Sequence, residues 1–404
     1  MRRPLFAAVS AAAVLLTIAL APSASAGPSA QGLTSRNVHV CSSPLPGTAA
    51  CDSIRHDRVD AYGKVSPNVV PAGYGPADIQ AAYGLAGATT STAITGKTVA
   101  IVDAYDDPSA EKDLGVYRSQ FGLPACTTAN GCFKKVNQSG NSSMPRGNGG
   151  WGQEISLDLD MVSSACPNCH ILLVEASSAS FANLGAGVNT AAKLGAAAIS
   201  NSYGGSDSSA TDAYNHPGIA VTASTGDNGY GVQSPASFPG VVAVGGTSLT
   251  RDASVPRGFT ESAWSGAGSG CSTINPKPTW QTSATLCNFK ANADVSAVAD
   301  PNTGVAVYDS YAYQGASGWM QFGGTSASSP IIASVYAQGS ALGAVNGTTI
   351  PNVAAYTWQH AASLHDVTSG SNGSCPTAVW CDAGTGTGWD GPTGLGTPNG
   401  TGAF

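Results

Sequence analysis

The sequence predicts an α/β fold, with a parallel sheet covered by helices on both faces, in a single domain with local disulfides. The first observation is that short apolar runs alternate with stretches of helical periodicity along most of the chain. The second is composition, because 42% hydrophobic residues among 404 suffice for a large core. The third is an even number of cysteines, ten, in closely spaced pairs.

The order of the expected elements predicts the parallel sheet. In residues 153–165, Ile155, Leu159 and Val162 recur at helical spacing, whereas short β-branched runs such as 98–102 predict strands. In chain order we expect a helix at 78–83, a strand at 98–102, helices at 107–121 and 153–165, a strand at 171–174, a helix at 181–194, strands at 197–200, 219–223 and 241–244, and a helix at 331–342. In such sheets the functional site lies beyond the carboxyl ends of the strands.

The first 26 residues have the pattern of an export signal. Arg2 and Arg3 precede an apolar segment at 6–20, and the small residues at 24–26 form a cleavage site. The apolar segment is shorter than the roughly 20 residues that span a bilayer. We therefore expect a secreted, extracellular protein with no membrane attachment once the signal is removed. Residues 27–70, rich in Ser, Pro and Gly, show no clear periodicity and predict an N-terminal extension or short prosegment before the domain at 71–404.

The cysteines fall into neighbouring pairs, which favours local disulfides in an exported chain. The pairs are Cys41 and Cys51, Cys126 and Cys132, Cys166 and Cys169, Cys271 and Cys287, and Cys375 and Cys381. Spacing does not fix connectivity, so nearest-neighbour pairing is a working assumption. The segment Cys166-Pro-Asn-Cys169, followed by His170, has a redox or metal site as its alternative interpretation, but no second ligand pair accompanies it.

The charge of the chain argues against a nucleic-acid partner. A net charge of −7 and the lack of basic runs after the first residues argue against nucleic-acid binding, which needs a basic face. We expect a monomer.

A glycine-rich turn before the last expected helix holds the candidate nucleophile. Residues 323–330 read Gly-Gly-Thr-Ser-Ala-Ser-Ser-Pro. The two glycines permit close approach to a substrate carbonyl, and Ser326 would lie at a helix N-terminus, which favours an oxyanion. An ordinary serine N-cap is the alternative interpretation. The pattern Gly-Thr-Ser-x-x-x-Pro resembles the nucleophile motif shared by subtilisins and by sedolisins, the serine-carboxyl peptidases.

The candidate base separates these two families. A subtilisin needs a histidine base, and none of the six histidines stands in the His-Gly-x-His helix start typical of subtilisins; they are His39, His56, His170, His216, His360 and His365. Glu154 and Asp158, four residues apart, would share one helix face. Two close carboxylates cannot both ionise cheaply, so such a pair can take and return a proton. A solvated helix face is the alternative.

The Glu-x-x-x-Asp spacing resembles the sedolisin signature, which implies that Glu154 is the base and Asp158 its partner. Asp103, at the end of the strand 98–102, matches the place of a subtilisin aspartate and keeps a subtilisin-type enzyme as the second hypothesis. Asp227 follows the strand 219–223, where sedolisins place an aspartic acid in the oxyanion hole. A protonated carboxyl can donate that hydrogen bond, and a turn-capping aspartate is the alternative.

The resemblance covers about residues 75–400 and includes Asn-Ser-Tyr-Gly-Gly at 201–205, which is similar to the strand that pairs with substrate backbone. It implies a subtilisin-like, single catalytic domain that hydrolyses protein or peptide substrates as an endopeptidase favoured at acidic pH. A catalytically inactive extracellular binding protein of the same fold is a third hypothesis. Sedolisins usually carry a long N-terminal prodomain, whereas only the segment 27–70 precedes the domain here.

Two segments near the end of the chain resemble the halves of the sedolisin calcium site. The resemblance implies one structural Ca²⁺, bound by the carboxylates of Asp366 and Asp390 and by the backbone carbonyls of Val367, Gly386 and Gly388. Calcium favours such an all-oxygen shell. A glycine-rich turn with two surface acids is the alternative interpretation.

Overall fold

The computed structural model describes residues 1, 33–66, 68–89, 96–339, 344–345, 348–349 and 352–404. The export signal expected at 1–26 lies, apart from Met1, outside these residues. Within the described ranges, no helix combines the length and apolar character needed to cross a bilayer.

An eight-stranded sheet forms the centre of the molecule, in the order β12-β11-β9-β7-β4-β6-β5, with β15 also paired to β11. Every pairing is parallel except that of β11 with β12. The strands are β4 (Thr98–Ala104), β5 (Phe133–Asn137), β6 (His170–Ala176), β7 (Ala198–Asn201), β9 (Ala220–Ser224), β11 (Val242–Arg251), β12 (Phe259–Ala263) and β15 (Val295–Val298). The predicted parallel sheet is confirmed.

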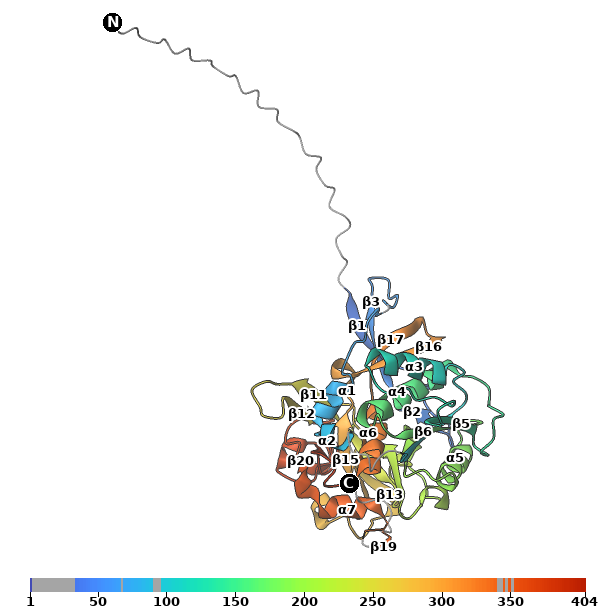
Figure 1. Ribbon diagram of the computed structural model, residues 1–404. Helices are drawn as coiled ribbons and strands as arrows, with labels where there is room; N and C mark the ends of the chain where they lie inside the picture. The colour runs from blue at the N-terminus through green and yellow to red at the C-terminus, as the bar shows by residue number, and fades with distance from the viewer. Residues whose placement is uncertain (2–32, 67, 90–95, 340–343, 346–347, 350–351) are drawn as a thin grey trace.

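Helices cover both faces of this sheet, as expected (Figure 1). Alternate side chains of β4 enter separate cores, because Val99 and Ile101 pack on the side of α4 and α6, whereas Ala100 and Val102 pack with α5. The helices are α1 (Pro76–Ala82), α2 (Ala86–Thr89), α3 (Ala110–Gln120), α4 (Gly149–Ala165), α5 (Phe181–Lys193), α6 (Thr325–Gln338) and α7 (Val353–Gln359).

A second sheet joins the N-terminal segment to strands from much later in the chain. It is antiparallel, in the order β1-β3-β17-β16, and Figure 1 shows β1 and β3 in blue beside the orange β16 and β17. Its strands are β1 (Thr34–His39), β3 (Ile54–Val59), β16 (Val305–Tyr313) and β17 (Ala316–Gly323). No periodicity at 27–70 predicted these strands; β1 pairs with the nearby β3, and β3 also pairs with β17 from much later in the chain.

Short strands complete the fold. The small sheet β10-β8-β2 brings an N-terminal strand beside the carboxyl end of β7. Its strands are β2 (Ala50–Cys51), β8 (Tyr203–Ser206) and β10 (Gln233–Ser234). Three further two-stranded sheets pair β13 (Gly270–Pro276) with β14 (Phe289–Asn292), β18 (Ala344–Val345) with β19 (Thr348–Thr349), and β20 (Leu364–His365) with β21 (Thr397–Pro398).

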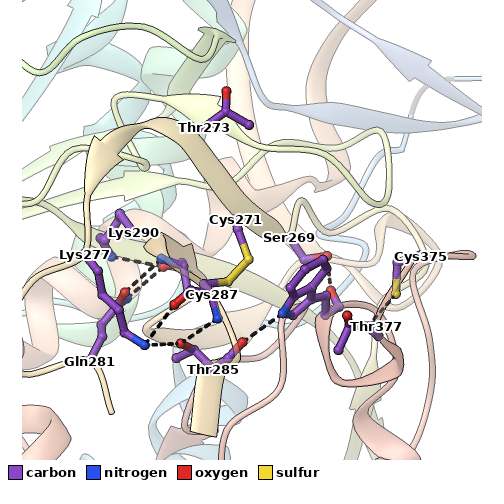
Figure 2. The surroundings of a disulfide bond; sticks show 12 residues. Ser269, Cys271, Thr273, Lys277, Gln281, Thr285, Cys287, Lys290, Cys375 and Thr377 are labelled. Atoms are coloured by element: carbon purple, nitrogen blue, oxygen red, sulfur yellow. Dashed lines mark hydrogen bonds between the residues drawn. A yellow bond between two sulfur atoms is a disulfide. The ribbon is translucent and has the colours of Figure 1, made fainter. Parts of the chain in front are cut away.

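All ten cysteines form disulfides between nearest neighbours. Figure 2 shows the bond between Cys271 and Cys287, which lies beside the pairing of β13 with β14. Lys277 braces this loop by donating to the carbonyl oxygen of Cys287 at 3.2 Å and to Thr285 Oγ1 at 2.8 Å. The nearest-neighbour pairing is confirmed, and Cys166 is bonded to Cys169.

Candidate active site

Ser326 is the second residue of α6, which begins at Thr325 rather than at residue 331 as expected. Gly324, which immediately precedes α6, has a φ of 96°, a left-handed conformation that favours glycine. A Cβ at this position would collide with Asp52 and Asp227. Ser326 is fully buried. Its Oγ donates to the carbonyl oxygen of Ser202 at 3.1 Å, and its amide nitrogen donates to that of Asp52 at 3.0 Å.

Pro330 lies inside α6 and changes the hydrogen bonding of its first turn. A proline has no N–H, so the carbonyl oxygen four residues earlier, that of Ser326, lacks its helical donor. Ser202 Oγ lies 3.3 Å from this carbonyl oxygen, although its single proton is closer to the carboxyl of Asp158. The proline thus helps to fix Ser202 against the N-terminus of α6.

The helix α4 positions the two predicted carboxyls one turn apart. Asn148 caps the helix, its side chain accepting from the amides of Gly150 at 3.0 Å and Trp151 at 3.2 Å. Glu154 and Asp158 are both fully buried, so the solvated-face interpretation is wrong. Burial explains the cost of ionising either group.

Burial is the largest cause that raises the pKa of Glu154 well above its ordinary value, followed by the charges of Asp158 and Asp103. The hydroxyls of Ser53 and Ser326 lie close enough to oppose this rise in pKa, although neither oxygen of Glu154 has a hydrogen-bond partner of normal geometry among the described residues. The influence of the Ser326 hydroxyl on the pKa of Glu154 indicates that the two side chains are near each other. The raised pKa favours the protonated form of this buried carboxyl.

Asp158 is the inner member of the pair. Burial is the largest cause that raises its pKa well above the ordinary value, followed by the charge of Asp103, while the hydrogen bond with Ser202 and the nearby Glu154 carboxyl lower it. Ser202 Oγ lies 2.8 Å from each carboxyl oxygen of Asp158.

Asp103, at the carboxyl end of β4, belongs to the same buried cluster. Burial raises its pKa to about 8, and neither of its oxygens has a hydrogen-bond partner among the described residues. Its charge acts on both carboxyls of α4. The sequence alone gave Asp103 no catalytic role in the absence of a histidine. The structure places it near Glu154 and Asp158, as a third buried carboxyl whose charge raises the pKa values of the other two.

The histidines occupy other places. His56 Nδ1 contacts Asn37 Oδ1 at 2.7 Å, and the rings of His216 and His360 contact backbone carbonyls at 3.0 and 2.8 Å. Among the described groups that shift the pKa values of Glu154 and Asp158, none is a histidine.

Asp227 follows β9 and faces the start of α6. Its Oδ1 accepts from the amide of Thr325 at 2.7 Å and from its hydroxyl at 2.9 Å. Its Oδ2 has no partner among the described residues. Burial, followed by the charge of Asp52, raises the pKa of Asp227 well above its ordinary value. A protonated Oδ2 is therefore free to donate a hydrogen bond.

Sequence reasoning missed three residues of this site: Asp52, Ser53 and Ser202. Ser202 lay within a segment already likened to a substrate-pairing strand. Nothing local marked Asp52 and Ser53, which the pairings of β2 with β8 and of β3 with β17 bury.

Of the five residues expected to hold calcium, Asp366, Gly388 and Asp390 lie near one another. Burial is the largest cause that raises the pKa of Asp390 to about 7, and the charges of Asp366 and Asp382 raise it further. Asp366 Oδ2 accepts from the amide of Gly388 at 2.9 Å, and both oxygens of Asp390 are bonded to Thr393. Carboxylates and backbone carbonyls are the oxygen donors that a divalent cation such as Ca²⁺ prefers. Within the described ranges, however, no group of three or more His, Cys, Asp or Glu side chains is arranged to hold a metal.

Comparison with known proteins identifies the family of this chain. The chain belongs to the subtilase family, whose pattern matches residues 140–379. Within that fold its relatives are sedolisins. Kumamolisin from Bacillus sp. (strain MN-32) is 30% identical over 388 residues, covering 83% of this chain and 64% of kumamolisin.

Two further comparisons involve sedolisin itself. Sedolisin from Pseudomonas sp. (strain 101) is 33% identical over 183 residues, covering 42% of this chain and 29% of sedolisin. The solved structure of Pseudomonas sedolisin, a serine-carboxyl proteinase complexed with pseudo-iodotyrostatin, matches with a TM-score of 0.65 and 25% identity. That match covers 82% of this chain and 96% of the solved one. The chain thus spans less than two thirds of the length of either curated relative.

Proposed function

We propose that this protein is a secreted serine-carboxyl endopeptidase that hydrolyses peptide bonds of protein substrates, favoured at acidic pH. Ser326 is the nucleophile, Glu154 the general base, Asp158 its proton-sharing partner and Asp227 the oxyanion donor. The observation that carries the proposal is the run of contacts from Asp158, one helical turn from Glu154 on α4, through Ser202 to Ser326 at the N-terminus of α6. The five disulfides support secretion.

The reaction follows from these positions. Ser326 Oγ attacks the substrate carbonyl while Glu154 takes its proton, and the amide of Ser326 together with protonated Asp227 stabilises the oxyanion. Glu154 then gives the proton to the leaving amine, and water hydrolyses the ester. Acidic conditions favour this scheme because the oxyanion donor works only when Asp227 is protonated.

A structural Ca²⁺ held by Asp366, Asp390 and nearby carbonyls would brace the C-terminal loops.

The decisive experiment replaces the two reacting groups. We expect Glu154→Gln and Ser326→Ala each to abolish hydrolysis of an unfolded protein substrate at acidic pH, with a loss on the order of 10⁴-fold or more. Glu111→Gln on α3 is the matched control, because its partner is the surface residue Thr128. Full activity in Glu154→Gln would overturn the mechanism.

A further inference from the structure

The outer edge of β16 is bonded to carboxyl side chains instead of a further strand. β16 ends the sheet β1-β3-β17-β16, and α3 and α4 lie against it (Figure 1). The backbone amide of Tyr308 donates to Asp160 Oδ2 of α4 at 2.9 Å. Two residues on, the amide of Ser310 donates to Asp113 Oδ2 of α3 at 2.6 Å. Two successive outward amides of this edge strand are therefore held by acids from two helices.

Two more carboxyls lie at the same place. Asp309 stands between the two held residues, and its Oδ1 accepts from the amide of Tyr311 at 2.7 Å. Asp107, just before α3, accepts at Oδ2 from Ser156 Oγ of α4 at 3.4 Å. Burial is the largest cause that raises the pKa of Asp309, and the charges of Asp107 and Asp113 raise it further, which indicates that the three carboxyls are near one another. We call Asp107, Asp113 and Asp309 the acid cluster.

The acid cluster lacks both cationic partners and hydrogen-bond donors. Its three side chains are fully buried. None of the ion pairs in the described part of the chain includes them. Asp113 Oδ1 and Asp309 Oδ2 have no hydrogen-bond partner among the described residues. A buried acceptor without a donor is costly, and a proton on either of these carboxyls supplies the missing donor.

The charged and titratable groups around the acid cluster come from every element packed against it. They are Asp106, Lys112, Tyr117, Arg118, Lys135, Asp160, Glu175, Tyr308 and Tyr311. The cations among them are bonded elsewhere. Lys135 is ion-paired with Asp106 and Glu175, whereas Lys112 and Arg118 donate to serine hydroxyls at 3.2 and 3.0 Å. No cation of the described chain therefore takes the place of the missing proton.

The acid cluster lies beside the elements that support the candidate active site. β16 pairs antiparallel with β17, with Asp309 opposite Gly318, and β17 ends at Gly323, next to the turn into α6. The helix α4, which is bonded to the edge of β16, also carries Glu154 and Asp158. An opening of this edge would loosen the support of both α4 and the turn before α6.

We propose that the acid cluster is a proton-dependent switch, which holds the outer edge of β16 on α3 and α4 while its carboxyls share protons and releases that edge when they ionise. In the closed form, a protonated carboxyl of Asp113 or Asp309 donates to the other. When that proton passes to solvent, two buried like charges repel each other and the edge opens to water. The inference goes beyond the proposed peptidase function and does not depend on it.

The direction of the switch follows from the shifted acids. Burial, the largest cause, raises the pKa of Asp309 to about 8 and that of Asp107 to about 6. Once the edge opens and these carboxyls reach water, they ionise near about pH 4. Opening therefore releases protons between about pH 4 and pH 8, so the open form becomes more favourable as pH rises.

Hydrogen–deuterium exchange of the full-length Ser326→Ala chain measures this opening without hydrolysis. We expect the protection of a peptide covering β16, corrected for the intrinsic exchange rate at each pH, to fall at least about tenfold per pH unit between about pH 5 and pH 7, since opening releases one proton or more. Asp309→Asn keeps the shape of the side chain and supplies an N–H donor that does not titrate. Its decline should be shallower by about tenfold per pH unit.

Asp103→Asn is the matched control, because Asp103 is a buried acid of the candidate active site and not of the acid cluster. We expect it to leave the decline in β16 unchanged. Protection of β16 that stays constant from pH 5 to pH 7, or an unchanged decline in Asp309→Asn, overturns the switch. An equal effect of Asp103→Asn also overturns it, because the edge then opens only by global unfolding. Should Asp309→Asn not fold, Asp113→Asn tests the same pair, with the same shallower decline expected.

Discussion

Ser202 Oγ lies 2.8 Å from both carboxyl oxygens of Asp158 and 3.3 Å from the carbonyl oxygen of Ser326. This one hydroxyl joins the acid pair of α4 to the helix that carries the candidate nucleophile. It stabilises the charged form of Asp158, because it lowers the pKa of that group.

Replacing Ser202 with alanine should therefore raise the pKa of Asp158 further and loosen the contact of α4 with α6. We expect the acidic limb of the kcat profile to move to higher pH, with a loss of about 1–3 kcal/mol in unfolding free energy from the unpaired buried carboxyl. Ser206→Ala, at the exposed end of β8, is the control. An unchanged pH profile in Ser202→Ala would contradict a role in proton sharing.

Replacing Asp227 separates hydrogen-bond donation from charge. Asp227→Ala removes the oxyanion donor and should lower kcat about 10²–10³-fold. Asp227→Asn keeps an N–H donor that needs no protonation, so we expect it to retain much more activity than the alanine variant and to stay active at higher pH. Measuring kcat from about pH 3 to pH 8 checks this. Equal losses in both variants would argue against donation by residue 227.

The buried acids predict that stability falls as pH rises. Burial raises the pKa of Asp103 to about 8 and that of Asp52 to about 7, and raises those of Glu154 and Asp158 well above their ordinary values. In the unfolded chain these groups ionise near about pH 4. Between about pH 4 and pH 8 the unfolded state therefore holds fewer protons, so the free energy of unfolding decreases as pH increases.

Thermal unfolding of Ser326→Ala across this range measures the effect without self-digestion. We expect Tm to be highest near about pH 4 and to fall steadily toward pH 8. Asp103→Asn removes one of the groups and should make the decline shallower. A Tm that rises over the same interval would show that these carboxyls are ionised in the folded protein.

Gly324 should tolerate no side chain. An alanine there combines an unfavourable φ of 96° with collisions against Asp52 and Asp227. Gly318→Ala is the matched control, because its φ is 84° but a Cβ would meet nothing within 4 Å. We expect the control to lose about 1–2 kcal/mol of stability and Gly324→Ala to lose more, together with all hydrolytic activity. Chemical denaturation and a peptidase assay compare the two variants. Equal losses of stability and activity would show that Gly324 is required only for its positive φ and not for the space beside Asp52 and Asp227.

The calcium proposal predicts a stability that depends on the metal. Adding EGTA should lower Tm by several degrees and excess Ca²⁺ should restore it, because a ligand that binds only the folded state stabilises it. Asp390→Asn should abolish this response, whereas Asp212→Asn, on a distant short helix, should retain it. If the Tm of the wild type changes with neither the chelator nor Ca²⁺, the calcium proposal is wrong.

The sequence by itself predicted the parallel sheet and the helices on its two faces, because each depends on periodicity over short stretches, whereas the disulfide pairing was a working assumption that the structure confirmed. It also singled out Glu154, Asp158, Asp227 and Ser326 as candidates through their motifs, and their catalytic roles stay predictions. Only the tertiary structure decided that Asp103 shares the buried electrostatic environment of the acid pair, since burial and charge proximity arise from packing. Likewise, only the pairing of β2 with β8 and of β3 with β17 carries Asp52 to Ser326, because strand pairing joins backbone groups across hundreds of residues and leaves no local trace in either partner.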